Sequence, residues 1–179
     1  WTGAAPLAVV LEVLHFTQDG GCNAYDLTVA RGFIGSISDI VCPGGPNSLN
    51  VTAGGIAYGS RSVAANDVTL RAANLPMQSF GFFNTSRAYG FVANPAGSSG
   101  DLCIGGAPIG RYVGPGQIQS SGSGNLVNLS IDVNQIPQPN GFVSAIPGDA
   151  WFFQFWYRDS SPNGPTSNFN AAIRIRFDG

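Results

Sequence analysis

The sequence predicts an all-β fold, a single antiparallel β-sandwich of the jelly-roll or immunoglobulin-like type with about nine to eleven short strands and little helix. Three observations predict it. The 25 glycines and 12 prolines fall between short apolar runs, where they punctuate strands. Helix-forming residues are scarce, with one glutamate, one methionine and no lysine. No segment keeps apolar residues at helical spacing over three turns.

Most of the predicted strands alternate apolar and polar residues, the period-two pattern of a strand with one buried face. In residues 126–132, for example, the apolar side chains are expected to point inward and the polar ones outward. The short segments 102–104 and 117–119 are expected to pair with each other. The other predicted strands are residues 7–16, 25–29, 33–41, 55–62, 67–73, 80–83, 88–92, 151–159 and 173–177.

Residues 151–157 hold six aromatic rings in seven positions, with a glutamine as the only interruption. At period two, alternate rings of this run point to the same face of the strand. A face made only of aromatic rings predicts the centre of the core. The residues of this face are Trp151, Phe153, Phe155 and Tyr157.

The opposite face of the same strand carries Phe152 and then Gln154, Trp156 and Arg158. An aromatic ring with an amide and a guanidinium beside it is a combination that holds a sugar, by stacking and hydrogen bonds. Gln154, Trp156 and Arg158 are therefore the candidate ligand-binding residues. The alternative is a structural role, in which a second layer or a loop covers Trp156 while Arg158 stacks on it and pairs with Asp159.

The charge content excludes several function classes. Charged residues make up 10% of the chain, the net charge is −2, and all eight basic residues are arginines, which disfavours nucleic-acid binding and excludes lysine chemistry. His15 is the only histidine and Glu12 the only glutamate. A Ser-His-Asp hydrolase or a glycosidase that needs paired acids is therefore not expected, and we predict a non-catalytic protein.

No metal or other cofactor is expected from the sequence. One histidine and three scattered cysteines do not make a zinc or copper site. Structural calcium stays open, because carboxylates and carbonyls in residues 19–26 or 159–163 offer oxygen ligands. No calcium-loop motif is present, and turn or cap roles for these aspartates are the alternative.

The three cysteines, Cys22, Cys42 and Cys103, include no CxxC pair. We favour a Cys42–Cys103 disulfide, because closing a loop of about sixty residues stabilises a fold by roughly 4 kcal/mol in the chain-entropy model. Cys22 is then either a buried free thiol or an intermolecular link.

The apolar run from Leu7 to Leu14 is interrupted by Glu12 and fits neither a signal peptide nor a membrane span, so we expect a mature chain with no membrane insertion. The run is apolar on both faces. It is either an ordinary first strand or a segment that completes the sheet of a neighbouring copy, which would make the chain a subunit of a filament. The face assigned to such an assembly is Leu7, Val9, Leu11 and Val13.

Several runs of the chain resemble a C-terminal β-rich module of large secreted proteins of environmental bacteria. The similar runs include Cys42-Pro43, residues 62–70, Gly100-Asp101-Leu102-Cys103, Pro147-Gly148-Asp149, residues 154–159 and residues 166–169. The resemblance covers residues 42–177, so residues 1–41 would be N-terminal strands outside the module. It implies secretion and the Cys42–Cys103 bridge, but no established activity.

Taken together, we predict one domain over residues 1–179, secreted or at the cell surface, that acts as an extracellular binding or interaction module. The expected ligand is a polysaccharide, and other extracellular proteins or further copies of the chain are the other expected partners. The alternative function is a structural subunit of an extracellular filament or surface assembly.

Overall fold

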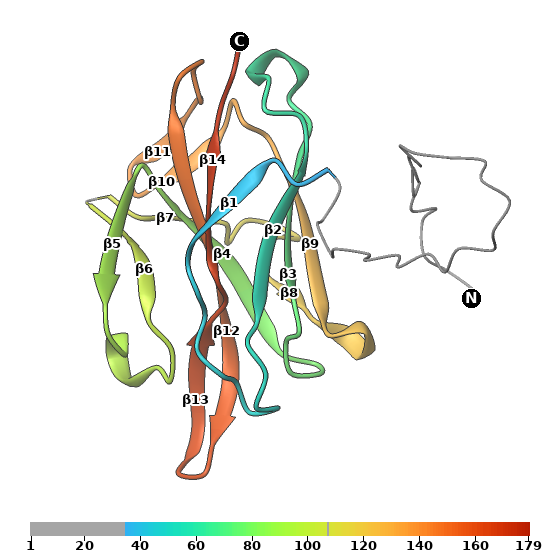
Figure 1. Ribbon diagram of the computed structural model, residues 1–179, viewed down its shortest axis with the longest axis vertical. Coiled ribbons are helices and arrows are strands. Elements are labelled where there is room, and N and C mark those ends of the chain that lie inside the picture. The colour runs from blue at the N-terminus through green and yellow to red at the C-terminus, as the bar shows by residue number, and fades with distance from the viewer. Residues whose placement is uncertain (1–34, 107) are drawn as a thin grey trace, which may run out of the picture. The chain divides into compact units, whose positions relative to one another are not determined.

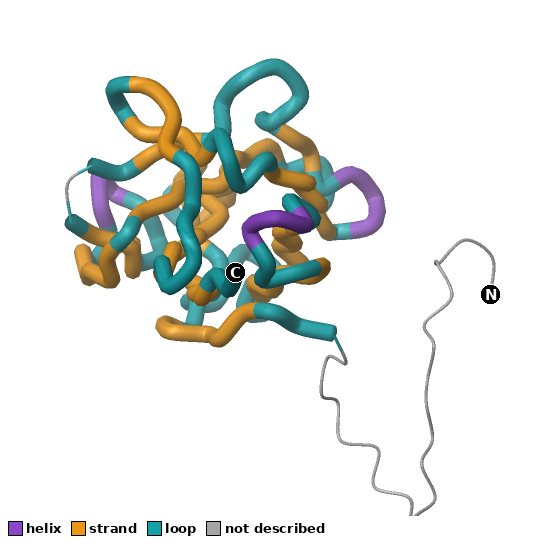
Figure 2. Tube along the Cα trace, turned by 90° about the horizontal axis from the view of Figure 1, so that it is seen from above, coloured by secondary structure: helices purple, strands orange, loops and turns teal. Residues whose placement is uncertain are grey.

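The computed structural model of the chain describes residues 35–106 and 108–179, and within them it confirms an all-β fold (Figure 1). Helical residues in this part are confined to three short 3-10 turns, which Figure 2 shows between strands and loops. The strands are β1 (Ser38–Cys42), β2 (Gly54–Gly59), β3 (Val68–Ala73), β4 (Phe80–Ser86), β5 (Ala88–Val92), β6 (Leu102–Gly105), β7 (Gly110–Arg111), β8 (Gln119–Ser120), β9 (Leu126–Ile131), β10 (Ile136–Gln138), β11 (Gly141–Val143), β12 (Ala150–Ser161), β13 (Gly164–Phe169) and β14 (Ala172–Arg176). The 3-10 turns are η1 (Val63–Ala65), η2 (Pro95–Gly97) and η3 (Gly122–Gly124).

The largest sheet is built around β12, the strand that contains the aromatic run. Its main order is β1-β14-β12-β4-β7, with β8 also paired to β4. β14 pairs with the first part of β12 and β13 with the second part, all antiparallel. Asn170, between β13 and β14, bridges the gap: its N–H donates to the carbonyl of Phe155 at 3.0 Å, and its Oδ1 accepts the N–H of Phe155 at 2.7 Å. β12 therefore stays hydrogen-bonded along its length.

A three-stranded sheet of order β2-β3-β9 supplies the other half of the main core. β3 and β9 alternate as predicted, and in β9 the side chains of Val127, Leu129 and Ile131 are buried while those of Asn128 and Ser130 are exposed. The predicted core face of β12 is confirmed, since its four side chains are fully buried and lie in one hydrophobic cluster with those of the three-stranded sheet. The four residues are Trp151, Phe153, Phe155 and Tyr157.

The opposite face of β12 is partly covered by the β5–β6 hairpin. Cys42 in β1 and Cys103 in β6 form the predicted disulfide, with 6.1 Å between their Cα atoms. Around it lies a second, smaller cluster that includes Ile104 of β6 and Phe152 of β12. The disulfide therefore fastens the hairpin to the large sheet.

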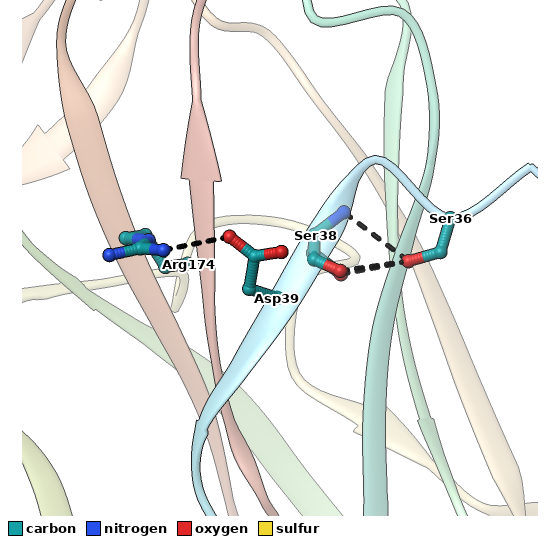
Figure 3. Close-up of polar contacts among 4 residues, drawn as sticks. All are labelled: Ser36, Ser38, Asp39 and Arg174. Atoms are coloured by element: carbon teal, nitrogen blue, oxygen red, sulfur yellow. Dashed lines mark hydrogen bonds and ion pairs between the residues drawn. The ribbon is translucent and has the colours of Figure 1, made fainter.

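Strand β1 is held to β14 by an ion pair across the two strands. Arg174 Nη2 lies 2.8 Å from Asp39 Oδ2, while Ser36 and Ser38 hydrogen-bond to each other beside it (Figure 3). Asp39 and Arg174 are direct partners in the strand register, so their side chains project from the same face.

Two predictions of pairing and extent need correction. Residues 117–119 do not pair with 102–104, because β8 pairs with β4 and β6 pairs with β5. The strands β7, β10, β11 and β13 were not predicted, since each is too short, or too rich in glycine, proline and polar residues, to show apolar alternation. With these hairpins the strands form four sheets.

The described residues, 35–106 and 108–179, belong to one compact unit. Predictions for earlier positions lie outside the described residues, so the single domain over 1–179 and the filament hypothesis stay predictions. The positions concerned are Leu7, Val9, Leu11, Glu12, Val13, His15, residues 19–26 and Cys22.

Candidate functional site

The prediction that Gln154 is a ligand-binding residue is wrong, because its side chain is not part of an exposed surface. The side chain is 1% exposed, beneath the segment that leads into β6. Its Oε1 accepts the N–H of Cys103 at 2.8 Å, and its Nε2 donates to the carbonyls of Asp101 (3.0 Å) and Asn170 (2.9 Å). A buried amide is stable only with such partners, so Gln154 is a structural residue that joins β12 to the disulfide-linked hairpin.

Trp156 lies beyond the part of β12 that the β5–β6 hairpin covers, and its side chain is half-buried. In the strand register it is opposite Phe82 of β4 and Phe169 of β13. The rings of Trp156 and Phe82 have their centroids 5.0 Å apart with an interplanar angle of 35°. Phe82 is also half-buried, so the two rings form a supported aromatic surface on the outer face of the large sheet.

An open groove of about 700 Å³ lies beside this surface, and we call it the Trp156 groove. Its lining comes from the second part of β12, from β13 and from the η2 turn. Arg158 lines it, so two of the three predicted binding residues are brought together while Gln154 is excluded. Its lining residues are Ala96, Gly97, Trp156, Arg158, Asp159, Ser160, Pro165, Thr166 and Ser167.

The η2 side of the groove is fastened to β13 by hydrogen bonds. Ser98 Oγ and the N–H of Ser99 both donate to the carbonyl of Ser167, at 2.9 and 2.8 Å. Thr166 Oγ1 donates to the carbonyl of Gly97 at 3.1 Å. These bonds hold the η2 segment against β13, although the two are about seventy residues apart in the sequence.

Arg158 and Asp159 differ in how their charges are satisfied. Arg158 is exposed, and within residues 35–106 and 108–179 its guanidinium makes no hydrogen bond or ion pair. The Asp159 carboxylate instead accepts the N–H groups of Ser48 and Ser160 and the Nδ2 of Asn168. The predicted Arg158–Asp159 pair does not form, because consecutive strand residues point to opposite faces.

The groove thus presents the Trp156 indole, which packs against Phe82, together with serine and threonine residues and the Arg158 guanidinium. Sequence reasoning missed the contributions of β13 and η2. Both segments are rich in Gly, Pro, Ser and Thr, which reads as loop in sequence. Only the pairing of β13 with β12 places them beside Trp156.

The other exposed or half-buried tyrosines do not line the Trp156 groove. Tyr58 lies in β2, with the Arg71 guanidinium 4.8 Å from its ring centroid. Tyr89 is 52% exposed on β5. Trp1 lies outside the described residues.

A second groove, of about 510 Å³, lies between the β7–β8 connection and the β10–β11 hairpin. Tyr112 lines it from the core side, and burial, together with the nearby Asp132 carboxylate, raises the pKa of its hydroxyl well above the usual value. Phe142 is exposed at its rim, while Arg111 and Asp132 add one charge of each sign. This groove has no supported ring comparable to the Trp156–Phe82 pair.

Two further features bear on cofactors and membranes. In the described part of the chain, no three His, Cys, Asp or Glu side chains come together as a metal-binding group. Asp159, one end of a suggested calcium segment, already has both oxygens engaged by protein donors. None of the helical turns among the described residues has the length and hydropathy of a membrane span.

No protein-family model, no curated protein and no solved structure matches the chain. The resemblance to a C-terminal module of secreted bacterial proteins therefore stays a prediction.

Proposed function

We propose that this chain is a non-catalytic extracellular binding module that holds a polysaccharide in the Trp156 groove. The observation that carries the proposal is that the two faces of β12 place the rings of the aromatic run in different surroundings. Four of its rings form the core, whereas Trp156 lines an open groove with its ring supported by Phe82.

The lining of the groove suits a sugar better than an apolar ligand. The flat apolar side of a pyranose stacks on an aromatic ring, and its hydroxyls need hydrogen-bond partners around that ring. Ser160, Thr166 and Ser167 are the hydroxyl-bearing residues of the groove lining, and Arg158 supplies further donors. The open ends of the groove suit a chain longer than one sugar unit.

A binding module is proposed instead of a glycosidase because the groove lining contains a single carboxylate. Glycoside hydrolysis uses two carboxyl groups on either side of the scissile bond. Asp159 is the one carboxylate in the lining of the Trp156 groove, and protein donors engage both of its oxygens. An extracellular location is supported by the Cys42–Cys103 disulfide, since disulfides persist in oxidising compartments.

The test is a pull-down of the full chain on insoluble polysaccharides such as cellulose, chitin and xylan. The parent should be retained on at least one of them, and Trp156→Ala should lose most of that retention because the stacking surface is removed. Trp156→Tyr, which keeps a ring at the same place, is the matched control and should retain binding. If Trp156→Ala is retained as well as the parent, or the parent binds no polysaccharide, the proposal fails.

A further inference from the structure

The charge of the Trp156 groove is not balanced. Its lining includes two charged residues, Arg158 and Asp159, whose side chains project from opposite faces of β12. Asp159 Oδ1 accepts the N–H of Ser160 at 2.8 Å and of Ser48 at 3.2 Å, and Oδ2 accepts Nδ2 of Asn168 at 3.1 Å. These donors satisfy the carboxylate, so Arg158 remains as the group that presents charge to a ligand.

Four other arginines show what Arg158 lacks. Arg61, Arg87 and Arg174 each form an ion pair with an aspartate. Arg71 bonds to the Asn128 side chain and the Tyr58 hydroxyl. Arg111 and Arg176 are also exposed and make no such bond among the described residues, so what distinguishes Arg158 is its place beside Trp156.

Arg158 is also correctly placed with respect to the stacking ring. Trp156 and Arg158 are two positions apart on β12 and project from the same face, so their Cα atoms are about 7 Å apart. A sugar ring that stacks on Trp156 therefore has its own substituents, or those of the next unit, beside the guanidinium. A planar guanidinium binds carboxylate and sulfate groups through paired hydrogen bonds.

We propose that the Trp156 groove selects an anionic polysaccharide, with a sugar ring stacked on Trp156 and a carboxylate or sulfate of the chain bound to Arg158. This inference rests on the proposed function, and it adds the charge of the ligand. A neutral glycan would leave the guanidinium with water only, and a cationic one would be repelled.

The experiment compares polymers that differ only in charge. The full chain is titrated with soluble polygalacturonate and with its methyl-esterified form, and separately with dextran sulfate and dextran, by affinity electrophoresis or calorimetry. The parent should bind at least one charged polymer roughly tenfold more tightly than its neutral counterpart at low ionic strength. The first pair tests carboxylate recognition and the second pair tests sulfate recognition.

Arg158→Gln is the decisive variant, and it should fold normally because the side chain has no partner among the described residues. It should bind the charged polymer roughly threefold to tenfold more weakly, and the loss should be clearly smaller for the neutral polymer, which has no anionic group for the guanidinium to bind. Arg176→Gln is the matched control. Arg176 is exposed and is the register partner of Ala150, which lies roughly 26 Å from Arg158 along β12. The control variant therefore removes the same charge at a site distant from the groove.

The outcomes separate the two proposals. Equal binding of charged and neutral polymers by the parent, or unchanged affinity in Arg158→Gln, overturns the anionic ligand and leaves polysaccharide binding intact. An equal loss in Arg176→Gln means non-specific charge attraction and also overturns it. If the parent binds none of these polymers or of the insoluble ones, both proposals fail together.

Discussion

The side-chain oxygen of Gln154 accepts the backbone N–H of Cys103 at 2.8 Å, so a buried amide of β12 and one half of the disulfide are directly joined. This contact fixes where the cover on the outer face of β12 ends. Phe152 and Gln154 lie beneath it, and Trp156, two positions further, lies in the open groove. The stability of the cover and the shape of the Trp156 groove are therefore linked, and both can be tested.

Replacing Gln154 by leucine should destabilise the fold without a large change in volume. The variant would leave the N–H of Cys103 and the carbonyls of Asp101 and Asn170 without partners in a buried site. We expect a loss of about 2–4 kcal/mol in the free energy of unfolding, measured by urea denaturation. Arg158→Gln, measured alongside, should change it by less than about 0.5 kcal/mol. A stable Gln154→Leu variant would contradict the structural role.

Removing the Cys42–Cys103 disulfide should cost about 4 kcal/mol, because the bridge closes a loop between positions 61 residues apart. The measurement is the melting temperature of the parent with and without a reductant, compared with Cys42→Ala/Cys103→Ala. The double variant should melt lower and should not respond to the reductant. A parent that melts at the same temperature under both conditions, with the bridge shown to be reduced, would count against this prediction.

Gly81 should not tolerate alanine, because β4 and β12 approach closely at this residue. An added Cβ would overlap the carbonyl oxygen of Trp156 and lie 2.6 Å from Cε1 of Phe155. We expect Gly81→Ala to lose about 1–3 kcal/mol in the free energy of unfolding. Gly45→Ala is the matched control, since an added Cβ there has no neighbour within 4 Å. Equal stability of the two variants would show that β4 can shift to make room.

Stability should fall in acid through Asp149. Burial acts to raise the pKa of this carboxyl, but the N–H of Ile146 and the guanidinium of Arg87 outweigh burial and hold the pKa below its ordinary 3.8. Because the unfolded state takes up the proton first, this contribution is present above about pH 3.8 and is lost as the pH falls through the folded pKa.

The measurement is a series of thermal melts between about pH 6 and about pH 2. Asp149→Asn should lower the melting temperature near neutral pH and reduce its decline in acid. If the variant and the parent decline in parallel below about pH 4, the Arg87–Asp149 pair does not supply this pH dependence.

Much of the fold could be predicted from local pattern. Period-two alternation identified the buried faces of β9, β12 and β14, because a strand in a two-layer core must place every second side chain inside. The favoured Cys42–Cys103 pair is confirmed, although loop length alone did not single it out, since a Cys22–Cys103 loop would be longer. The strands β10, β11 and β13 escaped prediction because tertiary pairing, not their own propensity, makes them strands.

The candidate site, like the fold, was only partly predictable from local pattern. By itself, the sequence determined which side chains of the aromatic run share a face, because the alternation of a strand is a local property of the backbone. Only the tertiary structure decided which side chains on the outer face of β12 stay accessible, because the segments that cover this face are distant in the sequence. The disulfide-linked β5–β6 hairpin buries Gln154. The η2 turn and β13 wall the groove in which Trp156 and Arg158 remain accessible.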